Sequence, residues 1–147
     1  MQVSRKGLAE LASHEGVVPM PYKDSVGVWT FGVGHTRYAG DPNPANLPKG
    51  VAQKLSYVFE VFARDVQKYA NDVSRALKVP VEQHEFDALV SFHYNTGAIA
   101  RASLMTKLNA GDRAGAARAF MYWTKPKEIT ARRQKEMELF KYGRYGN

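Results

Sequence analysis

One short segment of this chain differs from the rest in the spacing of its hydrophobic residues, and that difference limits the folds the chain can adopt. Between residues 20 and 36, aromatic and β-branched residues alternate with glycines, which favours short strands joined by tight turns. From about residue 51 onward, apolar residues recur at steps of three and four, which is typical of amphipathic helices. A short β segment followed by a long helical region predicts an α+β fold that is mainly helical.

Local signals predict the individual elements. We expect a hairpin that turns near residues 25–27, and an irregular loop at residues 38–50, where three prolines and two glycines interrupt regular structure. Ser4 and Asp112 are suited to begin helices, whereas Gly97 is suited to end one. The predicted helices cover about residues 4–15, 51–77, 83–95, 99–109, 113–123 and 128–141.

The length of 147 residues favours a single domain, because such a chain can bury roughly 68–70% of its unfolded surface in one core. Within residues 1–147 we expect a small hairpin lobe at about 16–50. A larger helical lobe would contain about 51–147 together with the helix at 4–15. No apolar run approaches the ~20 residues that span a bilayer, and no signal peptide is visible. We therefore expect synthesis in the cytoplasm and no integral membrane segment.

The formal net charge of +7 is concentrated in the last third of the chain, where residues 100–147 hold eleven basic and four acidic side chains. A basic surface attracts polyanions, so a helical nucleic-acid-binding protein is one alternative. Against it, the chain has neither an aromatic RNA-binding strand motif nor paired zinc ligands. Bacterial cell walls are also polyanionic, and the charge alone does not choose between these partners.

Several catalytic and cofactor-binding motifs are excluded, because their key residues do not occur at the required spacing. Neither His-Glu pair has a second histidine at the zinc-protease position, which falls on Val18 or Ala88. The glycines at 32 and 34 lack the third glycine of a dinucleotide-binding loop, and the chain has no G-x-S-x-G sequence. The absence of cysteine excludes disulfides and cysteine-ligated metals. Carboxylates remain as the best chemical candidates, with no metal or organic cofactor expected.

Glu15, Asp24 and Thr30 are the leading candidates for catalysis. A glutamate at the end of a helix, followed by an aspartate and a threonine around one hairpin, can place an acid and a carboxylate–hydroxyl pair about one substrate. This arrangement suits protonation of a leaving oxygen from one side and delivery of a water from the other. Each residue alone has a simpler explanation: Glu15 as a solvated helix end, Asp24 as a turn former, and Thr30 as an ordinary strand residue.

The segment EGVVPMPYKDSVGVWTFGVGHT, residues 15–36, resembles the catalytic signature of the phage-type lysozymes, glycoside hydrolase family 24. That family places eight residues between a glutamate and an aspartate, and five more before a threonine, as this chain does. The block EQHEFDALVSFHYNTG, residues 82–97, is similar to the family's central buried helix. One departure is that Glu128 and Ile129 stand where the family often has a Gly-Leu pair before two arginines.

The resemblance implies a lysozyme-like fold and a muramidase that cuts the β-1,4 bond between N-acetylmuramic acid and N-acetylglucosamine in bacterial peptidoglycan. It implies Glu15 as the general acid, with Asp24 and Thr30 positioning the attacking water for an inverting reaction. A helix C-terminus and burial would keep a carboxylic acid protonated. The substrate-binding positions that the resemblance implies are Tyr94, Asn95 and Ser103.

The family also has a structural histidine paired with an acid on the following long helix. His35 and Asp65 are the matching positions here, and we expect them to stabilise the fold. Trp29 and Trp123 are expected to be packing residues, the first in the hairpin lobe and the second in the helical lobe.

We expect a monomer that acts on the cell wall in the periplasm after release from the cytoplasm of the host cell, with a role in host cell lysis. The alternative from another class is a catalytically idle domain that binds peptidoglycan or serves as a scaffold.

Overall fold

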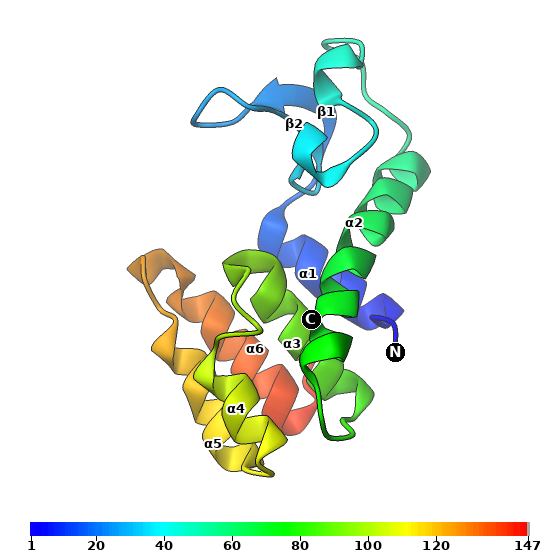
Figure 1. The fold of residues 1–147 in the computed structure, drawn as a ribbon. Helices are drawn as coiled ribbons and strands as arrows, with labels where there is room; N and C mark the ends of the chain where they lie inside the picture. Colours follow the sequence, from blue (N-terminus) through cyan, green and yellow to red (C-terminus); the bar gives the residue numbers. More distant parts are fainter. Residues whose placement is uncertain (147) are drawn as a thin grey trace. The chain divides into compact units, whose positions relative to one another are not determined.

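The structure is a computed structural model, and it describes residues 1–146. The chain divides into two compact units. The hairpin unit comprises Leu11–Asp65, and the helical unit comprises Met1–Glu10 together with the chain from Val66 onward. The divisions fall within the helices α1 (Arg5–Glu15) and α2 (Leu55–Ala76), so each of these helices contributes to both units (Figure 1).

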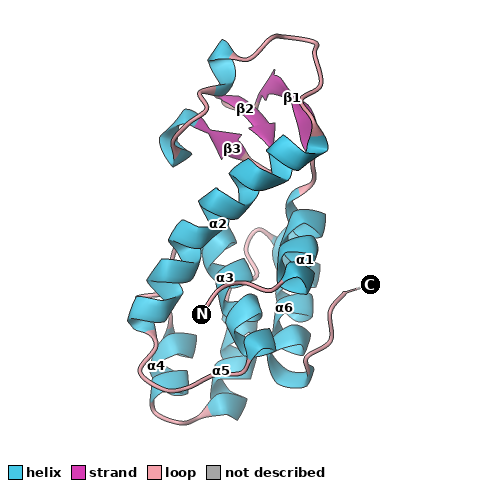
Figure 2. Cartoon of the chain, turned by 90° about the vertical axis from the view of Figure 1, so that its right-hand side faces the viewer, coloured by secondary structure: helices cyan, strands magenta, loops and turns pink. Residues whose placement is uncertain are grey.

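The hairpin unit contains an antiparallel sheet of three strands in the order β1 (Val18–Lys23), β2 (Trp29–Gly32) and β3 (His35–Thr36) (Figure 2). The predicted hairpin is confirmed as β1 and β2, which pair with a register irregularity along β1. The third strand was not foreseen. It is only two residues long, and a tight turn returns the chain beside β2, where Thr30 pairs with Thr36.

The core of the hairpin unit forms where the buried face of β2 meets α2. Phe31 is fully buried, and its ring centroid lies 6.2 Å from that of Tyr57. Gly32 has a left-handed φ of 69°, and a Cβ built on it would lie 3.2 Å from Val58 Cγ1. A side chain at position 32 would therefore meet both strain and crowding, which explains the glycine. The apolar stripe of α2 thus covers one face of the small sheet.

The segments on either side of the sheet differ from their predicted forms. The loop predicted at 38–50 contains short 3₁₀ helices at Arg37–Ala39 and Pro44–Asn46. The predicted helix at 51–77 begins only at Leu55, because Gln53 N donates to Pro19 O at 2.9 Å and ties this part of the chain to β1. A backbone bond to a strand holds Gln53 outside the helix, which hydrophobic spacing alone does not reveal.

The helical unit is built around α3 (Gln83–Thr96), whose residues from Glu85 to His93 are all buried. The helix α6 (Thr130–Tyr142) packs along α3, and the short helices α4 (Ser103–Asn109) and α5 (Arg113–Ala119) pack against each other (Figure 1). Among residues 1–146, no helix combines the length and apolar character needed to cross a membrane.

The predicted caps are confirmed. Ser4 Oγ accepts a hydrogen bond from Gly7 N at 3.0 Å, and the Asp112 carboxylate accepts one from Gly115 N at 2.8 Å. Gly97 ends α3 in the left-handed conformation, with φ of 65°. The helix predicted at 99–109 is shorter, because residues 99–102 form a separate turn, and the one predicted at 113–123 ends in a 3₁₀ helix, Phe120–Tyr122.

The end of the described chain is fastened to the helical unit through Asp87, on α3. Tyr145 donates its hydroxyl to Asp87 Oδ2 at 2.7 Å, and Ser4 N donates to Asp87 Oδ1 at 3.1 Å. Burial, together with the bond to Asp87, raises the pKa of Tyr145. Gly146 N donates to Glu10 Oε2 at 2.5 Å. Segments from both ends of the sequence therefore meet on one helix.

Candidate active site

The candidate active site begins with Asp24, the residue that directly follows β1. Its Oδ1 accepts hydrogen bonds from Val26 N and Val28 N, each at 2.9 Å. Its own N–H donates to Val28 O at 2.9 Å, and Gly27, with φ of 84°, closes the turn. Both side-chain bonds use Oδ1, so the carboxylate is fixed by the backbone with Oδ2 as the oxygen that can receive a ligand.

Thr30 lies on β2, two residues beyond Val28, and is 4% exposed. Its Oγ1 donates to Val28 O at 3.0 Å. Since the hydroxyl proton is directed at the carbonyl, the lone pairs of Oγ1 are what Thr30 can offer to a third group. Val28 is therefore bonded to both side chains: its N–H holds Asp24 and its carbonyl holds Thr30.

Glu15 is the last residue of α1 and is half-buried. The helix ends there because Gly16, with φ of 79°, donates its N–H to Ala12 O at 2.9 Å and then leaves the helical path. A Cβ built on Gly34, in the turn between β2 and β3, would lie 4.0 Å from Glu15 Oε1. The carboxyl of Glu15 thus lies beside the sheet that carries Thr30, and all three predicted residues belong to the hairpin unit.

The three predicted substrate-binding residues lie in the helical unit. Tyr94 is half-buried near the end of α3, and its ring centroid is 4.8 Å from that of Tyr69. The neighbouring Asn95 is exposed, and its Oδ1 accepts from Arg133 Nη2. Ser103 is exposed and begins α4. The end of α3 brings Tyr94 and Asn95 together, while Ser103 belongs to a separate helix.

Arg133 is a residue that sequence reasoning missed. It is 1% exposed, its Nε donates to Trp123 O at 2.8 Å, and its Nη1 pairs with Glu136. Arg132 Nε donates to the other oxygen of Glu136 at 3.0 Å. The sequence offered a signal for these two ion pairs, because Glu136 follows Arg133 by three residues and Arg132 by four, which places them on one face of a helix. The contact with Asn95, 38 positions away, had no local signal.

The predicted pairing of His35 with Asp65 is confirmed. His35 Nδ1 lies 2.6 Å from Asp65 Oδ2, and Nε2 lies 2.8 Å from the carbonyl oxygen of Pro42. Burial lowers the pKa of His35, but the bonds to Asp65 and Pro42 and the charge of Asp65 outweigh it, so the pKa is raised. Both tryptophans are half-buried: Trp123 packs edge-on against Phe92, and Trp29 lies against the ammonium groups of Lys23 and Lys49.

The site as a whole offers two carboxyl groups and a hydroxyl. Within residues 1–146, no group of three or more His, Asp or Glu side chains is arranged to hold a metal ion.

A mainly helical α+β fold with a small three-stranded sheet, and a glutamate at a helix end beside that sheet, is typical of a lysozyme-type protein. Residues 12–136 match the family described as phage lysozyme. Because the match covers most of the sequence, the chain belongs to the phage lysozyme family.

Individual relatives agree with this assignment. The chain is 34% identical to the endolysin of Salmonella phage P22, over 95% of this chain and 98% of that protein. Its structure is similar to that of the endolysin from Escherichia coli O157:H7 phage FAHEc1, with a TM-score of 0.89, 32% identity, and coverage of 100% and 98% of the two chains. It is also similar to the muramidase domain of SpmX from Asticaccaulis excentricus, with a TM-score of 0.82, 25% identity, and coverage of 95% and 97%.

Proposed function

We propose that this protein is a muramidase that hydrolyses the β-1,4 bond between N-acetylmuramic acid and N-acetylglucosamine in bacterial peptidoglycan. The observation that carries the proposal is the hydrogen bonding of Val28 to both Asp24 and Thr30, with the carboxyl of Glu15 beside the same sheet. Membership of the phage lysozyme family supports it, as do relatives named endolysin and muramidase.

Glu15 is the proposed general acid. It is the last residue of α1, and its carboxyl lies beside the sheet that carries Thr30. In the reaction, the proton of Glu15 passes to the bridging oxygen as the bond from that oxygen to the anomeric carbon breaks.

Asp24 and Thr30 are the proposed pair that orients the attacking water. Oδ2 of Asp24 and Oγ1 of Thr30 both act as acceptors, because Oδ1 is bonded to the turn and the Thr30 proton is bonded to Val28 O. A water that donates one hydrogen to each keeps a lone pair for the anomeric carbon. As the new carbon–oxygen bond forms, the water proton passes to Asp24. The reaction inverts the anomeric centre, as glycosidases do when roughly 6.5–9.5 Å separates their carboxyl groups.

Glycan binding is proposed for Tyr94, Asn95 and Ser103. The ring of Tyr94 suits the C–H face of a sugar. Asn95 accepts from Arg133 through Oδ1, so its Nδ2 is the proposed donor for an N-acetyl carbonyl. Ser103 is an exposed hydroxyl at the start of α4.

In the cell we propose a role in host lysis: synthesis in the cytoplasm, then action of the monomer on the wall in the periplasm. The net charge of +7 suits an anionic wall. Such attraction weakens with added salt, because the Debye length is about 8 Å at physiological ionic strength.

Mass spectrometry of digested peptidoglycan tests the proposal. Fragments that end in reducing N-acetylmuramic acid are expected, and proton NMR during early turnover should show the inverted α-anomer first. Fragments that end in reducing N-acetylglucosamine would contradict the assigned bond. Binding to peptidoglycan without release of any fragment would instead favour the catalytically idle domain.

A further inference from the structure

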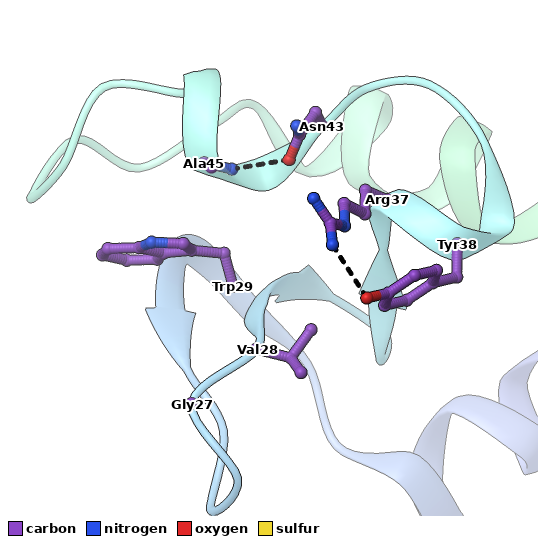
Figure 3. A pocket seen from close by; sticks show the side chains of 7 residues that line it. All are labelled: Gly27, Val28, Trp29, Arg37, Tyr38, Asn43 and Ala45. Atoms are coloured by element: carbon purple, nitrogen blue, oxygen red, sulfur yellow. Dashed lines mark hydrogen bonds between the residues drawn. The ribbon is translucent and has the colours of Figure 1, made fainter.

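A pocket lies in the hairpin unit, and Glu15, Asp24 and Thr30 are not among the residues that line it (Figure 3). It encloses about 230 Å³. Three short segments form its walls: residues 27–29 at the start of β2, Arg37 and Tyr38 from one 3₁₀ helix, and Asn43 and Ala45 around the next. The loop predicted to be irregular is therefore folded around a cavity.

Arg37 supplies the first positive charge. Its Nη2 donates to the Tyr38 hydroxyl at 2.9 Å, and its guanidinium lies 4.9 Å from the centre of that ring. Figure 3 shows the guanidinium bent over the pocket between Tyr38 and Asn43. The tyrosine contact raises the already high pKa of Arg37, so the group stays charged. The contact with Tyr38 thus fixes the direction of the exposed Arg37 guanidinium.

Lys49 supplies a second positive charge beside the pocket. Its Nζ donates to Ala45 O at 2.5 Å and to Leu47 O at 3.0 Å, which fixes an ammonium group that would otherwise move freely. The same Nζ lies 4.7 Å from the ring centre of Trp29, and the Nζ of Lys23 lies 5.4 Å from it. The half-buried indole is therefore flanked by two ammonium groups.

The remaining wall of the pocket adds a neutral donor. Asn43 Oδ1 accepts from Ala45 N at 3.1 Å, which leaves the amide Nδ2 as the part that can bond to a ligand. Among the described residues, none that lines this pocket is acidic. The pocket therefore suits a ligand with an anionic group next to an aliphatic part. The cations and the amide donor would bind the anion, and the faces of Trp29 and Tyr38 would contact the aliphatic part.

We propose that this pocket binds a carboxylate of the peptide stem that peptidoglycan carries on its muramic acid residues. The proposal rests on the proposed function. Arg37 would hold the carboxylate, Lys49 would add to its attraction, and Trp29 would cover the aliphatic part of the stem. Phosphate groups of other wall polymers have similar chemistry, but only the peptide stem is part of the proposed substrate itself.

The position of the pocket supports this choice of ligand. Residues 27–29 form one wall, and the same turn holds Asp24 through Val26 N and Val28 N. A peptidoglycan network carries many stems close to any glycosidic bond, so a stem that occupies the pocket increases the local concentration of glycan near Asp24. The pocket would therefore act on substrate affinity and leave the chemical step unchanged.

Hydrolysis of two substrates tests the proposal: intact peptidoglycan, and the same glycan after an amidase has removed its peptides. On intact peptidoglycan, Arg37→Gln is expected to raise the half-saturating substrate concentration about tenfold, as loss of a charge-assisted hydrogen bond does. On the stripped glycan it should leave that value unchanged. Arg118→Gln is the matched control, since Arg118 is an exposed arginine on α5, outside the pocket, and it should behave as wild type on both substrates.

A competition experiment identifies the anion. Free stem peptide should inhibit wild type on intact peptidoglycan, and it should inhibit Arg37→Gln about tenfold less. The same peptide with its carboxylates amidated should have no effect. Inhibition by inorganic phosphate or teichoic acid, with none by the peptide, would overturn the proposal in favour of a phosphate site.

The outcomes also separate this proposal from the proposed function. If wild type hydrolyses both substrates and Arg37→Gln is equally impaired on both, or on neither, the pocket does not bind the stem and the muramidase assignment stands. If wild type releases reducing sugars from neither substrate, the muramidase assignment itself fails.

Discussion

His35 Nδ1 lies 2.6 Å from Asp65 Oδ2, and this contact joins the short strand β3 to the helix α2 within the hairpin unit. The other ring nitrogen faces the carbonyl oxygen of Pro42 at 2.8 Å. Both partners are acceptors, so the protonated imidazole can donate to both, and these bonds raise the pKa of His35. The buried ring thus holds the loop that contains Pro42 and the sheet against one helix.

This pairing predicts a pH dependence of stability. The pKa of His35 is raised in the folded protein, whereas in the unfolded chain it is near the ordinary value of about 6.5. Between these two values the native state keeps a proton that the unfolded state has released. The stabilisation is therefore complete below pH ~6.5 and is lost as pH rises through the folded pKa. Urea unfolding measured across pH 5 to 9 should show this decline.

Asp65→Asn is expected to lower the pKa of His35 and to cost about 1–3 kcal/mol of unfolding free energy at pH 6. Hydrolysis below the melting temperature should change little, since the pair stabilises the fold. Proton NMR of the histidine Cε1–H follows the titration directly. An unchanged titration curve for His35 in the variant would contradict the role assigned to Asp65.

Glu15→Gln is expected to reduce hydrolysis of peptidoglycan by about 100- to 10,000-fold, because an amide cannot protonate the leaving oxygen. The fold should be unaffected, since Glu15 is half-buried at the end of a helix. Glu128→Gln is a matched control at an exposed position and should retain full activity. Activity of Glu15→Gln close to wild type would remove Glu15 from the mechanism.

Thr30→Val tests the hydroxyl at nearly constant shape. It should reduce kcat about 100-fold, because the water loses one of the two acceptors that orient it. Val28 O still accepts from Asp24 N at 2.9 Å, so the unfolding free energy should fall by no more than about 1 kcal/mol. Thr30→Ser retains the hydroxyl and should keep most of the activity. Equal activity of the valine and serine variants would show that the hydroxyl does not position the water.

Asp87→Asn tests the contact that fastens both ends of the described chain to α3. The buried carboxylate accepts from Ser4, Gln83 and Tyr145, and an amide cannot accept at both positions. We expect a loss of about 2–3 kcal/mol in unfolding free energy, against about 1 kcal/mol for Tyr145→Phe, which removes one donor only. Urea unfolding gives both values. Equal losses for the two variants would mean that Asp87 acts through Tyr145 alone.

The regular spacing of apolar residues and the residues that begin or end helices predicted most of the fold. The long apolar stripe predicted α2, and Ser4, Gly97 and Asp112 act as caps where their residue types favour it. The start of α2 could not be predicted because it depends on a backbone bond from Gln53 to Pro19 on the distant strand β1, and β3 could not because it is only two residues long. Such bonds leave no periodic pattern in a sequence.

The residues of the candidate site likewise divide into those that could be predicted from the sequence and those that could not. Glu15, Asp24 and Thr30 lie within sixteen consecutive residues, so their spacing alone suggested a shared turn. By contrast, Arg133 meets Asn95 only because α6 packs along α3, and the pocket beside Trp29 exists only because a proline-rich loop folds back over β2. Both depend on long-range packing, which a single sequence does not encode in any local pattern.

The helical unit takes in Met1–Glu10 as well as the chain from Val66 onward, and Asp87 and Glu10 bind the last described residues. A ribosome therefore delivers the whole of Leu11–Asp65 long before the helical unit has all of its parts. During translation, the hairpin unit is the first that can fold, while Met1–Glu10 waits for its partners in the chain from Val66 onward. A member of the phage lysozyme family built in this way completes its helical unit only after its hairpin unit has been made.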